Sequence, residues 1–233
     1  MPNETAERKQ PRVSINKLGE YLTGTPRNRR RIIEQQKRPP GFAISYYQPA
    51  QKAIVEFLES GATEHSVITD AIDKLERKTP KSDWEAHRIQ GCIEALETFY
   101  DNYDEVLDLE GRRFERGKNS APKLHLEGVE VSIRPELLVF GEDENGRKTA
   151  GAIKLYFGKN SPLDPEMGKY IATSTHQWVE EHLVPDNYEA PHRETGVYDV
   201  FSNTCIRAPR SYIRRRRDIQ AACDEIGMMW EQI

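Results

Sequence analysis

The prediction of the fold starts from the stretch IRPELLVFGEDENGRKTAGAIKLYF, residues 133–157. Two apolar, β-rich segments in it are separated by an Asn-Gly pair, which favours a tight hairpin turn. Side chains alternate along a strand, so Ala152 and Lys154 are expected to share one face of the second segment. The hairpin would place Glu136, where the first strand begins, next to Lys154. A carboxylate and an ammonium group are therefore expected to meet across adjacent strands.

Helices are predicted for most of the first 110 residues. Apolar residues recur at helical spacing, Ser14 and Thr25 are placed to cap two short helices, and Pro26 stands at the first position of the second. The longest helical pattern runs through KSDWEAHRIQGCIEALETFYDNYDEVL, residues 81–107. An N-terminal helical region, residues 1–82, is therefore expected before a core of residues 83–233.

Strands dominate the chain after a polar connector at residues 110–123. We expect a half-buried strand over 124–133 with a possible bulge at Gly128, and then the two strands of the hairpin. A helix capped by Asp164, a strand at VYDVFSN and a C-terminal helix follow. The order is αβββα, then β, then α, which predicts an α+β fold.

Composition narrows the class of protein. The chain has 233 residues, and 36% hydrophobic content is enough for one buried core. We expect a soluble, cytoplasmic protein, because no apolar run is long enough to cross a bilayer and the N-terminal segment lacks the apolar centre of a secretory signal. The cysteines at 92, 205 and 223 are scattered, which suits a reducing compartment.

Basic residues are concentrated although the net charge is −4. The charge near a binding site, more than the net charge of the whole chain, decides whether phosphates are attracted. Two arginine runs are therefore candidates for nucleic-acid binding. The alternative is a solvated helix face, and four consecutive arginines wrap more than one helical turn. The candidates are Arg27, Arg29, Arg30, Arg31, Arg214 and Arg215.

The motif in residues 133–157 resembles the signature of PD-(D/E)xK nucleases, in which a proline-acid pair and a later acid-x-lysine surround one or two magnesium ions. Pro135-Glu136 matches the first half with glutamate for aspartate, and Lys154 matches the lysine. The αβββαβ order is also that of the family's restriction-endonuclease-like core, and VSINKLGEYLTGTPRNRR resembles the helical opening of the RecB-type and CRISPR-adaptation exonuclease branch. In that branch a cysteine often precedes the proline and binds an iron–sulfur cluster; Thr25 stands there, so no cluster is expected.

The resemblance implies a site for Mg²⁺ or Mn²⁺. Magnesium needs oxygen ligands, and in this interpretation Glu136 and the carbonyl of Ile153 bind the metal while Lys154 orients water or offsets charge on the phosphate. The second acid of the pattern is absent, because Ala152 stands at its position.

Other residues could supply the missing ligand. Acids are found at Glu130, in the turn at 142–144, and at Glu180 and Glu181 on the following helix. Gln177 on that helix corresponds to a glutamine of the RecB-type branch. His87 stands roughly where that branch has a metal-binding histidine, although a lone helix histidine is more often a surface or packing residue.

Two hypotheses about function follow. The first is a magnesium-dependent DNA nuclease in phage defence, phage biology or repair, with arginines contacting backbone phosphates. The second is a catalytically inactive module that keeps the nuclease fold and binds nucleic acid or a protein partner. Ala152 favours the second, and the retention of Glu136 and Lys154 favours the first. DNA is the partner that the first hypothesis expects, the second leaves nucleic acid and a protein partner open, and no membrane is expected.

Overall fold

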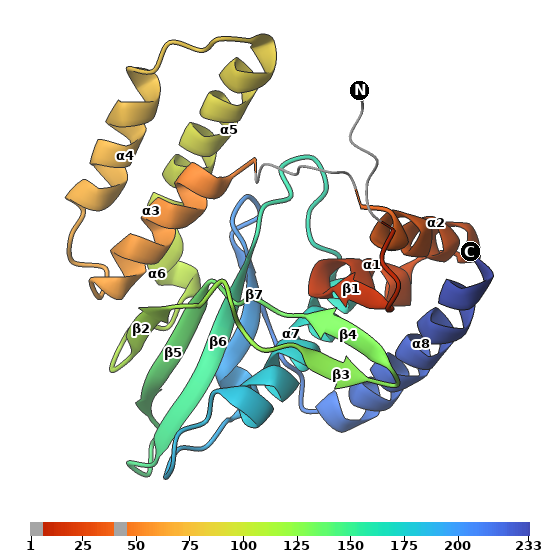
Figure 1. The fold of residues 1–233 in the computed structure, drawn as a ribbon. Helices are drawn as coiled ribbons and strands as arrows, with labels where there is room; N and C mark the ends of the chain where they lie inside the picture. Colours follow the sequence, from red (N-terminus) through yellow and green to blue (C-terminus); the bar gives the residue numbers. More distant parts are fainter. Residues whose placement is uncertain (1–6, 40–45) are drawn as a thin grey trace.

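A computed structural model describes residues 7–39 and 46–233 of the chain (Figure 1). The helices are α1 (Ile15–Thr23), α2 (Pro26–Lys37), α3 (Gln48–Glu59), α4 (Ser66–Glu76), α5 (Asp83–Tyr100), α6 (Tyr103–Val106), α7 (Pro165–His182), the 3-10 turn η1 (His192–Glu194) and α8 (Tyr212–Gln232). The strands are β1 (Arg12–Ser14), β2 (Arg113–Arg116), β3 (Leu124–Leu126), β4 (Val129–Ser132), β5 (Leu137–Glu142), β6 (Lys148–Tyr156), β7 (Thr195–Asp199) and β8 (Thr204–Arg207). Helices and sheets both occur, with helices at the N-terminal end, so the predicted α+β class is confirmed.

The larger sheet has five strands in the order β2-β5-β6-β7-β8. Strands β5 and β6 form the predicted antiparallel hairpin, and β6 pairs in parallel with β7 after the chain has crossed over through α7. Taken with α5, which precedes it, this sheet follows the order αβββαβ through β7. The expected order of elements is therefore present in one sheet.

The first strand of that order is not the one expected from the sequence. The pattern over 124–133 predicted one bulged strand beside the hairpin, but the chain turns back at Glu127 and Gly128, which have φ values of 47° and 78°. Strands β3 and β4 therefore form a separate hairpin, which pairs with β1 in a three-stranded sheet of order β1-β4-β3. Strand β2, inside the presumed polar connector, takes the edge position of the large sheet instead.

Local sequence signals place the helix starts correctly. Ser14 accepts a hydrogen bond from Lys17 N, and Thr25 accepts one from Asn28 N just before Pro26. These side chains satisfy backbone donors that the first helical turn leaves unpaired. Asp164 caps α7 in the same way, by accepting from Met167 N.

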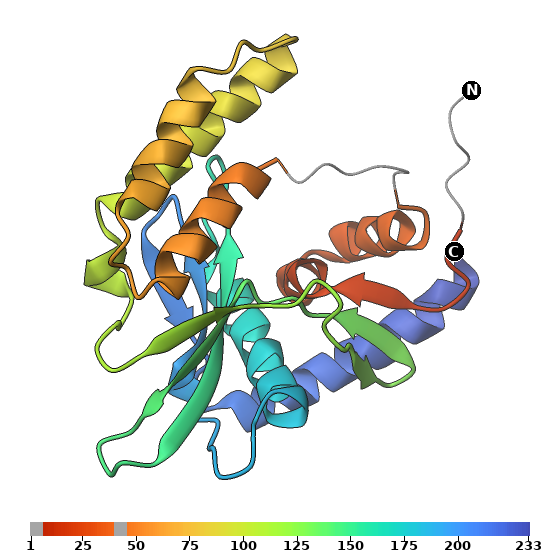
Figure 2. The ribbon, with the colours of Figure 1, turned by 60° about the vertical axis from the view of Figure 1, so that its left-hand side comes forward.

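Two hydrophobic cores lie on opposite faces of the large sheet (Figures 1 and 2). On one face, α1, α2, α7 and α8 pack with the small sheet; on the other, α3, α4 and α5 pack with β2 and β5. The helices of the expected N-terminal region thus belong to both cores. The expected boundary at residue 82 falls between α4 and α5, which pack on each other.

Among the described residues, no helix is long and apolar enough to cross a membrane. The three cysteines are free thiols. Burial raises the pKa of Cys92 and Cys205 and raises that of Cys223 to about 12, so none of them is activated as a thiolate nucleophile.

Asp199 fixes the loop that leads from β6 into α7. Its side chain is fully buried, and it accepts hydrogen bonds from Leu163 N at 2.9 Å and from Phe201 N at 3.3 Å. The backbone N–H of Val200 donates to Tyr156 O at 3.0 Å. The ends of β6 and β7 and the start of α7 are thereby held together.

We expect Asp199→Ala to lower the free energy of unfolding by roughly 3 kcal/mol, because it leaves buried N–H groups without an acceptor. For a chain of this size the Tm should fall by about 6 to 12 °C, measured by thermal unfolding. The exposed Asp186→Ala is the matched control. Equal losses in the two variants would contradict this role of Asp199.

Candidate functional site

Glu136 and Lys154 meet at the start of the β5–β6 hairpin, as the sequence predicts. Lys154 Nζ lies 2.6 Å from Glu136 Oε1 and donates a second hydrogen bond to the carbonyl of Arg134 at 3.1 Å. Leu155 N donates to Glu136 Oε2 at 2.6 Å, and Gln51 Nε2 donates to Oε1 at 3.2 Å. The side chains of Glu136 and Lys154 are only 10% and 11% exposed. Both carboxylate oxygens are thus held in place, and water screens the attraction between the two charges only weakly.

Backbone contacts position Glu136 before its side chain acts. Gly117, at the end of β2, donates its N–H to Glu136 O at 2.9 Å. A Cβ atom on this glycine would lie 1.8 Å from the carbonyl oxygen of Pro135, so no other residue permits so close an approach without a backbone shift. The backbone at the end of β2 and the start of β5 is therefore held in the position that brings the Glu136 carboxylate next to β6.

The ion pair lies where two pockets adjoin. The first pocket, of about 650 Å³, lies between α3 and the segments around Gly117 and Pro135. The second, of about 320 Å³, lies between the start of α1, the end of α2 and Ser132. Arg134 and Lys154 line both pockets. We call the two together the basic groove.

The lining of the basic groove is strongly cationic. Lys52, Arg116, Lys118, Arg134 and Lys154 line the first pocket, and Arg8, Arg12, Arg134 and Lys154 line the second. Glu136 is the single acid among the described lining residues. Arg116 also pairs with Glu59 at 2.9 Å, and Arg12 lies 4.0 Å from Glu130. An anion entering the groove therefore meets a net positive surface on a chain whose overall charge is negative.

The groove does not fit the paired-carboxylate metal site that the resemblance implies. Ala152 faces the first core, is 0% exposed and carries no ligand atom. Within residues 7–39 and 46–233, no group of three or more His, Cys, Asp or Glu side chains could hold a metal ion. Magnesium bound to protein through one carboxylate depends on phosphates and water for its other ligands. Among the described residues of the groove, Glu136 is the one carboxylate that could contact the metal, and the groove therefore lacks the paired carboxylates of the nuclease site.

Four of the acids considered as replacements for position 152 are engaged elsewhere, and Glu142 and Glu144 line a different pocket. Glu130 pairs with Lys123 at 2.6 Å. Asp143 closes the far turn of the hairpin, where hydrogen bonds from the backbone and side chain of Arg147 lower its pKa to about 2. Glu180 accepts from Arg216 of α8, and Glu181 accepts from Gln177 at 2.8 Å.

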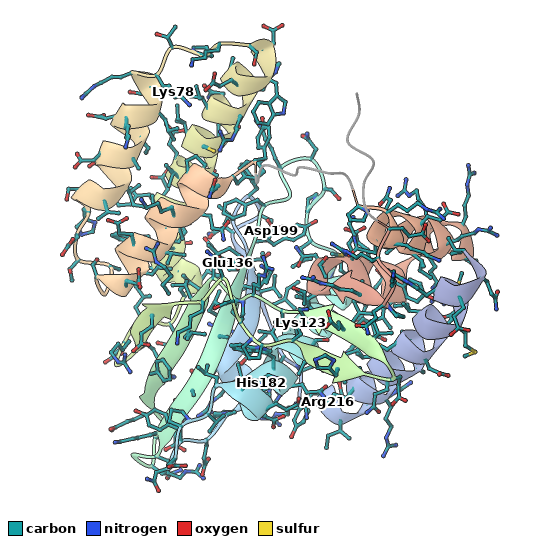
Figure 3. The ribbon with its side chains drawn as sticks, viewed as in Figure 1. Lys78, Lys123, Glu136, His182, Asp199 and Arg216 are labelled. Carbon is teal, nitrogen blue, oxygen red and sulfur yellow. The ribbon has the colours of Figure 1, made fainter. Side chains whose placement is uncertain are left out.

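The helix candidates also lie away from the groove. Figure 3 shows Glu136 toward the upper part of the large sheet, whereas His182, at the end of α7, and Arg216 lie toward its lower part. Helix α7 begins next to the end of β6 and runs back along it, so Gln177, Glu180 and Glu181 are carried away from Lys154. The structure does not bring them to Glu136.

The two other proposed metal ligands are His87 and the backbone carbonyl of Ile153. His87 is exposed on α5, and its side chain makes no hydrogen bond with the described residues. The side chain of Ile153 lies in the second core, on the opposite face of β6 from Lys154, whereas its carbonyl belongs to the β6 backbone next to Lys154, and the role of that carbonyl stays a prediction.

The arginine runs do not line the basic groove, and several of their members pair with acids on neighbouring helices. On α2, Arg29 contacts Glu225 at 3.4 Å, Arg30 contacts Glu34 at 3.2 Å, and Arg31 donates to Asn28. On α8, Arg215 contacts Glu166 at 2.9 Å. Arg27 and Arg214 are exposed on the same two helices. Their proposed role in nucleic-acid binding stays a prediction.

The residues that make the groove cationic were missed by sequence reasoning. Arg8 and Arg12, Lys52, and Lys118 come from three separate segments, and only the fold gathers them. Gln51 was missed too, since a helix glutamine gives no signal that it contacts a carboxylate 85 positions away.

A double-mutant cycle on Glu136→Gln and Lys154→Met tests whether the pair is energetically coupled. Each single change should lower the free energy of unfolding by roughly 3 kcal/mol, because it leaves a nearly buried charge unpaired. The double variant should lose at least about 1 kcal/mol less than the sum, in urea unfolding. The same cycle on the exposed Lys169–Glu166 pair should give a coupling of about 0.2 to 1 kcal/mol. Additive losses at the groove pair would exclude the coupling.

Restoring a carboxylate with Ala152→Glu should not restore a metal site. The new side chain would enter the first core between β6 and α7, and an uncompensated buried charge costs roughly 3 kcal/mol or more. We expect a fall in Tm of about 6 °C or more that added Mg²⁺ does not reverse, with Ala152→Gln as the size-matched uncharged control. A variant whose Tm rises with Mg²⁺ would show that position 152 reaches the groove.

Comparison with family models and curated proteins does not assign a function to this site. No family model matches the chain, and no curated protein matches it. The resemblance to PD-(D/E)xK nucleases is therefore carried by Pro135, Glu136 and Lys154 and by the order of elements around them.

Proposed function

We propose that this chain binds nucleic acid, with DNA as the expected ligand, along the basic groove. The observation that carries the proposal is the imbalance of charge in the groove, where the described lining residues include seven basic side chains and one carboxylate, Glu136. Nucleic acid carries one negative charge per phosphate, and neutralising those charges releases counterions, which is the main source of sequence-independent affinity. The walls supply side chains suited to backbone contacts, and the position of Lys154 between both pockets allows a strand to contact them in succession.

Charges that have no acidic partner support the proposal most strongly. Lys52 and Lys118 are exposed at the first pocket, and Arg134 is exposed where the two pockets meet. None of these three forms an ion pair with an acid in the described part of the chain. Glu136 does not cancel their charge, because its oxygens are occupied by Lys154, Leu155 and Gln51. In this proposal the carboxylate orients Lys154 and leaves the other cations to the ligand.

Magnesium-dependent hydrolysis of DNA is the second candidate function. The specific observation in its favour is the 2.6 Å contact between Glu136 and Lys154 within a pocket, in an αβββαβ order like that of the nuclease family. The absence of a second carboxylate from the described groove lining opposes it. Binding of DNA requires only the basic side chains. Hydrolysis also requires a metal ion, which Glu136 would have to hold as the only carboxylate ligand from the described groove lining.

Binding to labelled single- and double-stranded DNA tests the proposal. We expect Kd values in the micromolar range near physiological salt and a steep loss of affinity as salt rises. Lys52→Ala and Lys118→Ala should each weaken binding and reduce the slope of log K against log salt by about 1. Lys74→Ala on α4, an exposed lysine outside the groove, is the matched control. Binding that is insensitive to salt, or equally reduced by Lys74→Ala, would contradict the proposal.

The same preparations separate the two candidate functions. Linear and circular DNA are incubated with Mg²⁺ or Mn²⁺, and Glu136→Gln and Lys154→Met are compared with the unmodified chain. Cleavage that both changes abolish would establish the nuclease. Salt-dependent binding without cleavage would establish the binding module.

A further inference from the structure

The second pocket of the basic groove differs from the first in having no acid among the described residues that line it. Arg8, Arg12, Arg134 and Lys154 contribute four cations to a space of about 320 Å³. The nearest carboxylates are directed elsewhere: Glu130, 4.0 Å from Arg12, pairs more closely with Lys123, and Glu136 pairs with Lys154. The pocket is therefore more cationic than a single phosphodiester would require.

Two of these cations repel each other. Partial burial and the neighbouring Arg12 lower the pKa of Arg8, and the opposing attraction of Glu130 does not outweigh them. Arg8 donates a hydrogen bond to the backbone carbonyl of Gln36 at 3.2 Å, a neutral partner that holds the guanidinium in place. An anion bound between the two arginines would remove this repulsion.

Neutral polar groups complete the lining. Ser14, Asn16, Gln36 and Ser132 all line the pocket. The Oδ1 atom of Asn16 is buried and has no hydrogen-bond partner among the described residues, which is rare for a buried polar atom. Because Oδ1 accepts hydrogen bonds, it offers nothing to a phosphate oxygen; the donors that this lining can offer are N–H and O–H groups such as Asn16 Nδ2 and the Ser132 hydroxyl.

The chemistry of the pocket suits a phosphate monoester better than a diester. A monoester carries between one and two negative charges near neutral pH and has three terminal oxygens, whereas a diester linkage carries one charge. Arginine guanidinium groups bind such oxygens in pairs of parallel hydrogen bonds. Three arginines beside the Glu136-paired Lys154 match the higher charge, and about 320 Å³ is room for a phosphate and part of the attached nucleoside.

We propose that the second pocket binds the terminal phosphate monoester of a nucleic-acid strand. The identification of the ligand as a strand rests on the proposed function. Because Arg134 and Lys154 line both pockets, a strand anchored by its end in the second pocket would pass its next phosphates into the first. The chain would then recognise ends, and Glu136 would lie within a few nucleotides of the bound terminus.

The experiment compares otherwise identical single-stranded oligonucleotides that carry a 5′-phosphate, a 3′-phosphate or hydroxyl groups at both ends. We expect one phosphorylated form to bind about tenfold more tightly than the hydroxyl form. Equal affinity of all three for the unmodified chain would overturn the proposal.

Substitutions in the second pocket test whether a preference for the phosphorylated end arises there. Arg8→Gln and Arg12→Gln should remove the preference for the phosphorylated end, and Ser132→Asp, which adds a negative charge, should do the same without removing an arginine. Lys52→Ala, in the first pocket, is the matched control and should weaken all oligonucleotides equally. A preference that survives both arginine substitutions would place the end elsewhere and overturn the proposal. Thermal unfolding of each variant confirms that it is folded.

Inorganic phosphate and a nucleoside monophosphate separate this proposal from the proposed function. If no oligonucleotide binds but both small ligands raise the Tm, and Arg12→Gln abolishes the rise, the pocket is a phosphate monoester site while the proposed function fails. If oligonucleotides bind and neither the small ligands nor a terminal phosphate has an effect, the proposed function stands and this inference falls.

Discussion

The carboxylate of Glu136 is the point on which this site depends. One oxygen holds the ammonium of Lys154 and the amide of Gln51, and the other accepts from the backbone of Leu155. These contacts connect β5, β6 and α3, and Gly117 adds β2 through its hydrogen bond to the Glu136 carbonyl. A charge so poorly exposed must be compensated within the protein, so the local backbone is constrained to supply the partners.

The same constraint explains why the groove is cationic. Lys154 neutralises Glu136, and no further acid is directed into either pocket from the described lining, so the remaining lysines and arginines keep their charge available. The conspicuous arginine runs behave in the opposite way, because Arg29, Arg215 and Arg216 pair with acids of another helix and tie helices together. Density of charge in the sequence and charge available to a ligand are thus different properties of this protein.

Sequence reasoning succeeded where the determining interactions are local. Capping by Ser14 and Asp164 and the contact of Glu136 with Lys154 follow from neighbours in the chain or from a short hairpin. It failed at 124–133, since nothing in the pattern shows that Glu127 adopts a positive φ and turns the strand back, and at β2, where Phe114 is the only buried side chain. The composition of the groove could not be predicted, because it results from long-range packing of separate segments.

The two hydrophobic cores share the large sheet, but the basic groove has one wall from each. The first pocket is walled by α3 of the second core, and the second pocket by α1 and α2 of the first. A polyanion lying across Lys154 would contact elements of both cores at once. Occupancy would then raise the stability of both halves together and make them unfold as one.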